Sequence, residues 1–145
     1  MLDYLKNLTA DIYISNGDFD SWSKSKEENL VLELAGFRIG LTHGHQIIPN
    51  GDPDALDRLQ RKLDVDILIT GHTHSHQVTK SSVGLQINPG SATGAYSVQS
   101  PHEAPPLPSF ILLDLEGTKA TVYAYTLQEG KVKVDKTDHT RVTSL

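Results

Sequence analysis

Two histidines directly follow a short apolar segment, and this arrangement limits the possible fold more than any other feature of the chain. Residues 66–70 (DILIT) lead into Gly71, His72, Thr73 and His74. An apolar run of this length is typical of a buried strand, and residues two apart on a strand lie on the same face. His72 and His74 are therefore predicted to point together into one crevice, where two imidazoles can bind a metal ion.

Two other predicted strands end in residues of similar chemistry. Residues 37–42 lead into the sequence HGH at 43–45, and residues 11–15 lead into GDFD at 17–20. One histidine at a strand end is usually a hydrogen-bonded surface residue, and Gly-Asp-x-Asp alone is most often a turn. Three such clusters, with NPGS at 88–91 after a further strand, together favour a metal site.

The composition excludes several classes of function. The chain has 145 residues, no cysteine and a formal net charge of −5. Disulfides and cysteine nucleophiles are thus excluded, and the negative charge argues against nucleic acid as a partner. No apolar run approaches the roughly 20 residues that span a bilayer, and the first residues lack the pattern of a signal peptide. We expect a soluble, cytoplasmic protein with a single domain over residues 1–145.

Helices and strands alternate in the predicted first half of the chain. Leu2, Leu5 and Leu8 predict a short helix, and residues 11–15 predict a strand. Residues 30–34 and 37–42 flank Ala35-Gly36, which predicts a hairpin turn. A second helix is predicted from its N-cap and first residue, Asp52 and Pro53, and from a buried leucine stripe at Leu56, Leu59 and Leu63.

Strands and turns make up the predicted second half. The expected strands are 77–80, 85–88, 109–115, 119–128 and 131–136, with a proline-containing loop at 92–108. This order predicts an α/β fold with two packed sheets and helices outside them.

At these motifs the chain resembles the calcineurin-like metallophosphoesterases. Longer segments are similar to one branch of that superfamily, the small-subunit family of the retromer sorting complex: HGHQIIP at 43–49, DVDILI at 64–69 and NPGSATGAY at 88–96. The resemblance covers nearly the whole chain, and it implies a metallophosphoesterase-like sandwich of two sheets with flanking helices.

The resemblance also implies an N-terminal strand-helix-strand unit that this sequence lacks. Family members begin with a strand that ends in Asp-x-His, a motif that occurs nowhere here. Either the sequence is truncated or the protein lacks the unit. We favour truncation, because the missing strands would be central in the sheet and their loss would expose unpaired strand edges.

Metal ligands follow from the resemblance residue by residue. Asp18, His43 and His72 match the ligands of one ion, and His74 matches a ligand of a second ion whose other ligands belong to the missing unit. We expect one weakly bound divalent ion, zinc or manganese. The remaining histidines match no ligand position and are expected to be surface or structural residues: His45, His76, His102 and His139.

Catalysis is not expected from this ligand set. Hydrolysis by two metals needs ions about 3.5–4 Å apart and an acid to protonate the leaving group. Active family members carry that acid, a histidine, at the position of Phe19. We predict no catalytic residue and a non-catalytic scaffold. The alternatives are an active divalent-metal-dependent phosphodiesterase and a relic of the fold without a specific partner.

One predicted docking surface is the apolar loop of Ile47, Ile48 and Pro49, beside His43. The resemblance implies that this side packs against the large α-solenoid subunit of retromer. Such a protein would act in sorting from endosomes to the Golgi and to the plasma membrane. It would reach the endosomal membrane only indirectly, as a peripheral part of the complex.

A second docking surface is predicted from the strand at 119–127, which is apolar on both faces. Such a strand is either buried on both sides or exposes a patch. The resemblance favours the patch, since Leu112, Tyr123 and Tyr125 match a surface that retromer regulators bind.

Overall fold

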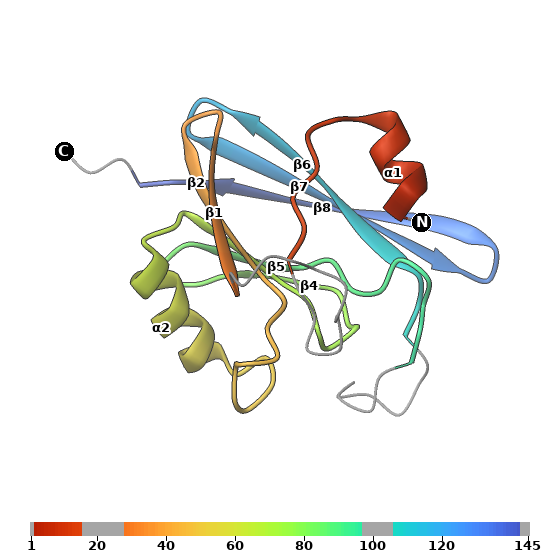
Figure 1. The fold of residues 1–145 in the computed structure, drawn as a ribbon, viewed down its shortest axis with the longest axis horizontal. Helices are drawn as coiled ribbons and strands as arrows, with labels where there is room; N and C mark the ends of the chain where they lie inside the picture. Colours follow the sequence, from red (N-terminus) through yellow and green to blue (C-terminus); the bar gives the residue numbers. More distant parts are fainter. Residues whose placement is uncertain (1, 16–27, 97–105, 143–145) are drawn as a thin grey trace.

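Two β-sheets pack face to face in the structure, a computed structural model that describes residues 2–15, 28–96 and 106–142 (Figure 1). One sheet has five strands and the other three. The longer helix, α2, covers the face of the five-stranded sheet that is turned away from the three-stranded sheet. The predicted two-sheet α/β fold is therefore confirmed.

The five-stranded sheet is built around three parallel strands. Its strands are β1 (Asn29–Leu34), β2 (Phe37–Thr42), β3 (Ile67–Thr70), β4 (Gln77–Lys80) and β5 (Leu85–Asn88). They lie in the order β1-β2-β3-β5-β4; β2, β3 and β5 are parallel, and the edge strands β1 and β4 are antiparallel to their neighbours. The carboxyl ends of β2, β3 and β5 therefore meet at one edge, where the predicted metal ligands begin.

Local sequence signals account for the β1–β2 hairpin and for α2 (Pro53–Leu63). Ala35 and Gly36 have φ of 49° and 81°, as a tight hairpin turn requires. A side-chain oxygen of Asp52 accepts a hydrogen bond from the Ala55 amide at 2.8 Å and caps the helix. The predicted leucine stripe of α2 is half-buried, whereas Gln60, which was not predicted to lie inside, is fully buried.

The three-stranded sheet closes the core. It consists of the antiparallel strands β6 (Ser109–Glu116), β7 (Lys119–Gln128) and β8 (Lys131–Thr140). Ala120 and Val122 of β7 are completely buried and pack with side chains of β2, β3 and β5: Phe37, Ile39, Ile67, Leu85 and Ile87. Strand β8 continues four residues past its predicted end because it pairs with β7 along its whole length.

The N-terminal segment differs in part from its prediction. Helix α1 (Leu2–Leu8) is confirmed, but residues 11–15 are not a strand. An apolar run becomes a strand only where a neighbouring strand pairs with its backbone, and none of the described strands does so here. Tyr13 and Ile14 are consequently 53% and 37% exposed.

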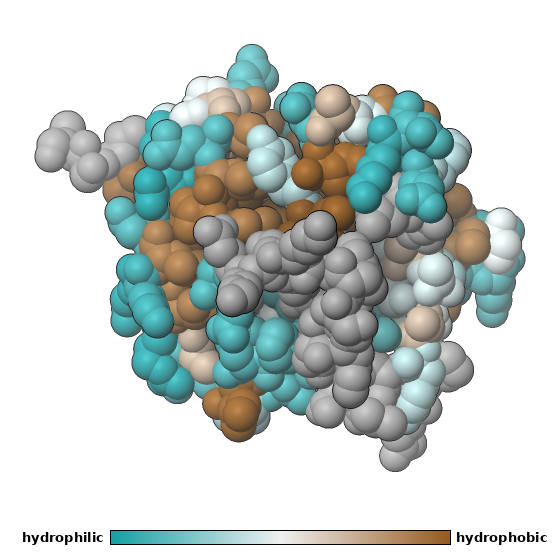
Figure 2. All heavy atoms as spheres, viewed as in Figure 1, coloured by the Kyte–Doolittle hydropathy of each residue, from teal (hydrophilic) through white to brown (hydrophobic). Residues whose placement is uncertain are grey.

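Apolar side chains gather on the face seen in Figure 2, over β1 and β2 and toward α1. Val31 and Leu34 of β1 and Leu5 and Leu8 of α1 are each more than 40% exposed. None of the helices in the described ranges is long and apolar enough to cross a membrane.

Candidate functional site

The loops after β2 and β3 lie side by side and bring His43 and His72 together. Thr42 and Thr70, the last residues of the two parallel strands, are register partners. The Gly71 amide then donates to the carbonyl of His43 at 2.9 Å and holds the two loops together. As a result, the ring centroids of His43 and His72 are 5.1 Å apart.

The loop that carries His72 and His74 has an unusual backbone. Both histidines adopt left-handed φ values, 71° and 57°, which residues other than glycine rarely do. Strand β3 ends at Thr70, so the strand alternation that predicted one shared face does not reach these histidines. Backbone strain of this kind persists only where the surroundings hold it.

Asn88, at the end of β5, supplies that support. Its side-chain amide donates to the Gly71 carbonyl at 3.2 Å and to the Thr73 hydroxyl at 2.9 Å. Its side-chain carbonyl accepts from the Gly90 amide at 3.0 Å. The asparagine of the NPGS motif therefore joins the loops after β3 and β5.

His74 is held by the loop that follows this motif. Its Nδ1 lies 2.8 Å from the carbonyl oxygen of Ala95. A carbonyl can only accept, so Nδ1 carries the proton and the lone pair of the neutral ring is on Nε2. The Ser91 hydroxyl accepts from the Ala95 amide at 3.0 Å and fixes this loop. His74 is thus oriented as a metal-binding histidine commonly is, with one nitrogen anchored.

His45 joins the cluster, although the sequence matched it to no ligand position. Its Nδ1 is 3.1 Å from Nδ1 of His43, and its ring centroid lies 5.3 Å from that of His43 and 6.5 Å from that of His72. The signal that could have found it was its position in HGH, two residues after a predicted ligand.

His43, His45 and His72 form a histidine cluster. Zinc and manganese both bind imidazole nitrogens, so the side chains of this cluster are chemically suited to a divalent ion. Within the described ranges, however, no three His, Asp or Glu side chains are arranged to hold an ion. Two of the residues on which the prediction relied, Asp18 and Phe19, lie outside these ranges. The structure therefore brings together His43 and His72, and it anchors His74 separately.

The first predicted docking surface is only partly exposed. Ile48 is 80% exposed and Pro49 is exposed as well, with a cis peptide bond between them. Ile47 is 6% exposed, so its place in this surface was predicted wrongly. The tight turn, in which the Ile47 amide donates to the Gly44 carbonyl at 3.1 Å, directs its side chain inward.

The second predicted docking surface lies on the outer face of the three-stranded sheet. Leu112 pairs with Tyr123, and Phe110 pairs with Tyr125. Leu112 and Phe110 are 53% and 56% exposed, and the Phe110 and Tyr125 rings stack with centroids 4.8 Å apart. Tyr123 and Tyr125 of β7 are half-buried, whereas Leu112 and Phe110 of β6 form an exposed patch on the same face. The sequence analysis did not include Phe110 in this surface, because the strand pairing that places it opposite Tyr125 was not assigned from the sequence.

A sandwich with histidines at the carboxyl ends of its parallel strands is the architecture of one large class of phosphoesterases. The model of the calcineurin-like phosphoesterase superfamily domain matches residues 1–118. A curated relative from Schizosaccharomyces pombe, vacuolar protein sorting-associated protein 29, is 37% identical over 135 residues, which are 92% of this chain and 72% of the relative. The chain belongs to this superfamily and, within it, to the family of vacuolar protein sorting-associated protein 29.

Solved structures agree with this assignment. A single mutant of Vps29 from Entamoeba histolytica superimposes with a TM-score of 0.88 at 44% identity, covering 95% of this chain and 74% of that one. Wild-type Vps29 of the same organism, complexed with zinc, has a TM-score of 0.85 at 46% identity, covering 94% and 74%. The predicted resemblance and fold are thereby confirmed.

Proposed function

We propose that this chain is a non-catalytic scaffold subunit of the retromer complex. It would act as one domain, in the cytoplasm, and reach the endosomal membrane only through its partners. The observation that carries the proposal is the apolar patch on the outer face of β6 and β7, where Phe110 and Leu112 are more than half exposed. Exposed apolar patches of this kind mark interaction sites.

Two separate surfaces would serve two kinds of partner. The large α-solenoid subunit would dock on the loop of Ile48 and Pro49, which follows the histidine cluster directly in the chain. Regulators would dock on Leu112, Tyr123 and Tyr125, where the stacked Phe110 ring enlarges the patch. Aromatic and apolar anchors of this type usually provide most of an interface's binding energy.

The histidine cluster would hold at most one divalent ion, through Asp18, His43 and His72. A solved relative complexed with zinc supports the binding of a divalent ion. A bound ion would supply Lewis acidity and a hydroxide near neutral pH. Phe19 has no proton to give a leaving group, and His74 alone would not retain a second ion, so this ligand set supports binding without turnover.

Paired substitutions test the two surfaces. Ile48→Asp should abolish binding of the purified large subunit, because the carboxylate would lose its hydration in the complex. Tyr125→Ser should leave that binding unchanged and weaken only regulators, because it removes an aromatic anchor. Pulldowns of both partners by both variants are the measurement, and circular dichroism confirms that each variant folds.

Each variant serves as the control for the other. Loss of both partners in one folded variant would show that the surfaces are not separate. Unchanged binding of the large subunit by folded Ile48→Asp would contradict the assignment of the loop.

A further inference from the structure

A small cavity lies between the start of α2 and the strands β3, β4 and β5. It offers about 70 Å³ to the centres of water molecules, whereas a single water needs only about 10–15 Å³ by the same measure. Gly51, Pro53 and Gln77, which line it, are exposed, and Gln86 and Ile87, which also line it, are buried. The cavity therefore opens to the surface and has room for one extended side chain.

Two buried amides are oriented so that one acceptor remains beside this cavity. Gln60 Nε2 donates to three backbone carbonyls, so Gln60 Oε1 can only accept. Gln86 Nε2 donates to this Oε1 at 3.2 Å and to the Asp57 carboxylate at 2.6 Å. Both of these partners need a donor, so the Gln86 amide cannot be reversed and its Oε1 points away from them.

Gln86 Oε1 is open to the cavity. Two side-chain atoms of the described residues are sealed from solvent without a partner, Gln46 Oε1 and Arg141 Nε, and Gln86 Oε1 is not one of them. Because Gln86 is only 6% exposed and lines the cavity, its oxygen faces the cavity. An apolar occupant would leave this acceptor without a donor, which costs free energy. An occupant that donates hydrogen bonds is therefore favoured.

The other walls of the cavity suit a lysine side chain. Thr79, the register partner of Gln86, and Thr70 both line the cavity, and their hydroxyls can accept hydrogen bonds. With Gln86 Oε1 they match the three donors of an ammonium group. The methylene groups of a lysine bury readily against apolar surface, which four further lining residues supply: Ile47, Pro53, Leu56 and Ile87.

The start of α2 favours a cation as the occupant. Asp52, Asp54 and Asp57 place carboxylates at the N-cap and in the first two turns. The amides of Ala55 and Leu56 both donate to Asp52, so the N–H groups that would attract an anion are already occupied. The carboxylates therefore decide the charge of the group that fits here.

We propose that this cavity receives a lysine side chain of the protein that docks on the loop of Ile48 and Pro49. Gly44, Ile47 and Gly51 belong to the same loop and line the cavity. A partner seated on the loop therefore reaches the opening of the cavity. The inference rests on the proposed function, because the large retromer subunit is the partner in question.

Titration of n-butylammonium, an analogue of the lysine side chain, tests the cavity without any partner. It should shift the NMR signals of the Gln86 side-chain amide and the Thr79 backbone amide at millimolar concentration, as expected for so small a ligand. Butanol, which has the same chain length but no charge, should shift them less.

A double variant, Thr70→Val with Thr79→Val, keeps the shape of the cavity and removes two acceptors. It should bind n-butylammonium about 10-fold more weakly than the wild type does. Thr140→Val, at the exposed end of β8 and outside the cavity, is the matched control and should bind as the wild type does. Circular dichroism confirms that both variants fold.

Calorimetry with the purified large subunit tests the occupant. The double variant should bind the subunit about 10-fold more weakly than the wild type does, and Thr140→Val should bind it equally well. Lysine-to-methionine substitutions across the subunit should identify one lysine whose loss weakens binding to the wild type but adds no loss in the double variant.

The two experiments fail in different ways. Absent n-butylammonium shifts at Gln86, or equal shifts with butanol, would refute a site for an ammonium group. Equal binding of the subunit by wild type and double variant, or no lysine coupled to the cavity, would refute the docked lysine and leave at most a site for free amines. A wild type that binds no large subunit would refute the proposed function and this occupant with it, while the n-butylammonium titration would still decide the chemistry of the cavity.

Discussion

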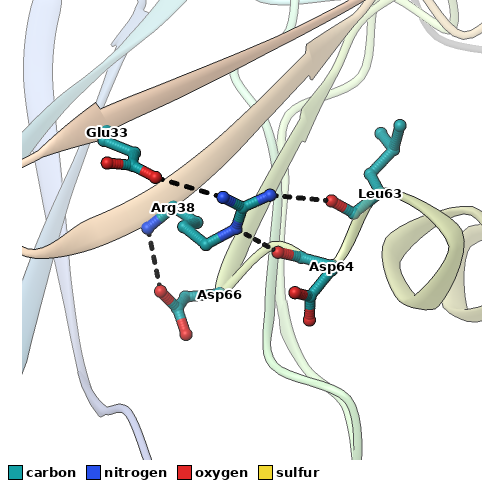
Figure 3. A network of polar contacts seen from close by, with 5 residues as sticks. All are labelled: Glu33, Arg38, Leu63, Asp64 and Asp66. Atoms are coloured by element: carbon teal, nitrogen blue, oxygen red, sulfur yellow. Dashed lines mark hydrogen bonds and ion pairs between the residues drawn. The ribbon is translucent and has the colours of Figure 1, made fainter.

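At the scale of single residues, Arg38 connects two strands and the end of a helix (Figure 3). Its Nε donates to the Asp64 carbonyl at 2.6 Å and one Nη donates to the Leu63 carbonyl at 3.4 Å. The other Nη pairs with the Glu33 carboxylate at 3.1 Å. The guanidinium thus caps the carboxyl end of α2, where a cation is favourable.

Replacing Arg38 should destabilise the fold more than replacing its ionic partner. Arg38→Met leaves helix-end carbonyls without their donor and should lower the free energy of unfolding by about 1–2 kcal/mol. Glu33→Gln should cost less than about 0.5 kcal/mol, because the Glu33 side chain is 74% exposed. Urea unfolding of both variants is the measurement, and equal losses would contradict the capping role.

The residues of the site were predictable only in part. Motif spacing identified His43, His72 and His74 as chemically related, because residue types at strand ends are visible in a sequence. The Nδ1–Nδ1 contact of His45 and the anchoring of His74 by Ala95 depend on turns with positive φ. Those turns are set by contacts between distant loops, which no local pattern encodes.

The missing acid leads to a prediction about activity. Phe19 cannot protonate a leaving group, so turnover of bis-p-nitrophenyl phosphate with manganese should equal that of His72→Ala. Both proteins should also equal a blank without protein. A rate that depends on His72 would support the alternative, an active phosphodiesterase.

At the scale of elements, α2 is fastened to the sheet through a buried glutamine. The side-chain amide of Gln60 donates to the carbonyls of Val65, Asp66 and Leu85 at 3.1–3.3 Å. Gly84 makes room for it, since a side chain there would lie 2.5 Å from the Asp66 oxygen and 2.6 Å from the Gln60 nitrogen. The buried polar group is therefore satisfied only while position 84 has no side chain.

Gly84→Ala should accordingly lower the free energy of unfolding by about 2–4 kcal/mol, because backbone or helix must shift. The matched control is Gly117→Ala in the β6–β7 turn, where φ is 59° and no atom lies within 4 Å of the added carbon. In this control, backbone strain alone should lower the free energy of unfolding by about 1 kcal/mol. Thermal unfolding measures the stability of both variants. Similar losses of stability would show that the neighbouring atoms shift and relieve the crowding at position 84.

Elements with their own local signals were predicted well. The hairpin at Ala35-Gly36 and the capped start of α2 need only turn and cap chemistry, and both were confirmed. Residues 11–15 have the same apolar pattern as β3, yet only β3 has strands on both sides. Pairing is a property of the assembled sheet, so the pattern could not separate the two.

At the scale of the whole molecule, the two sheets also meet at the end of β8. His139, half-buried on β8, lines a small pocket with Asp66, which directly precedes β3, and with Ser82 and Gly84 of the β4–β5 turn. This burial lowers the pKa of His139 below its usual 6.5; the charge of Lys80 lowers the pKa further, and Asp66 opposes both effects. Folding therefore favours the neutral imidazole.

Acid should consequently weaken the contact between the sheets. Because the folded-state pKa of His139 is depressed, the unfolded chain binds more protons, and the free energy of unfolding rises with pH in this window. The stabilisation is complete above pH 6.5 and is lost as pH falls from 6.5 through the lower folded-state value.

Between about pH 7.5 and about pH 5.5, wild type should lose more stability in urea than His139→Gln does. Lys80→Met should fall between them, since it removes one cause of the depressed pKa. If wild type and His139→Gln lose the same amount of stability over this pH range, His139 does not cause the pH dependence.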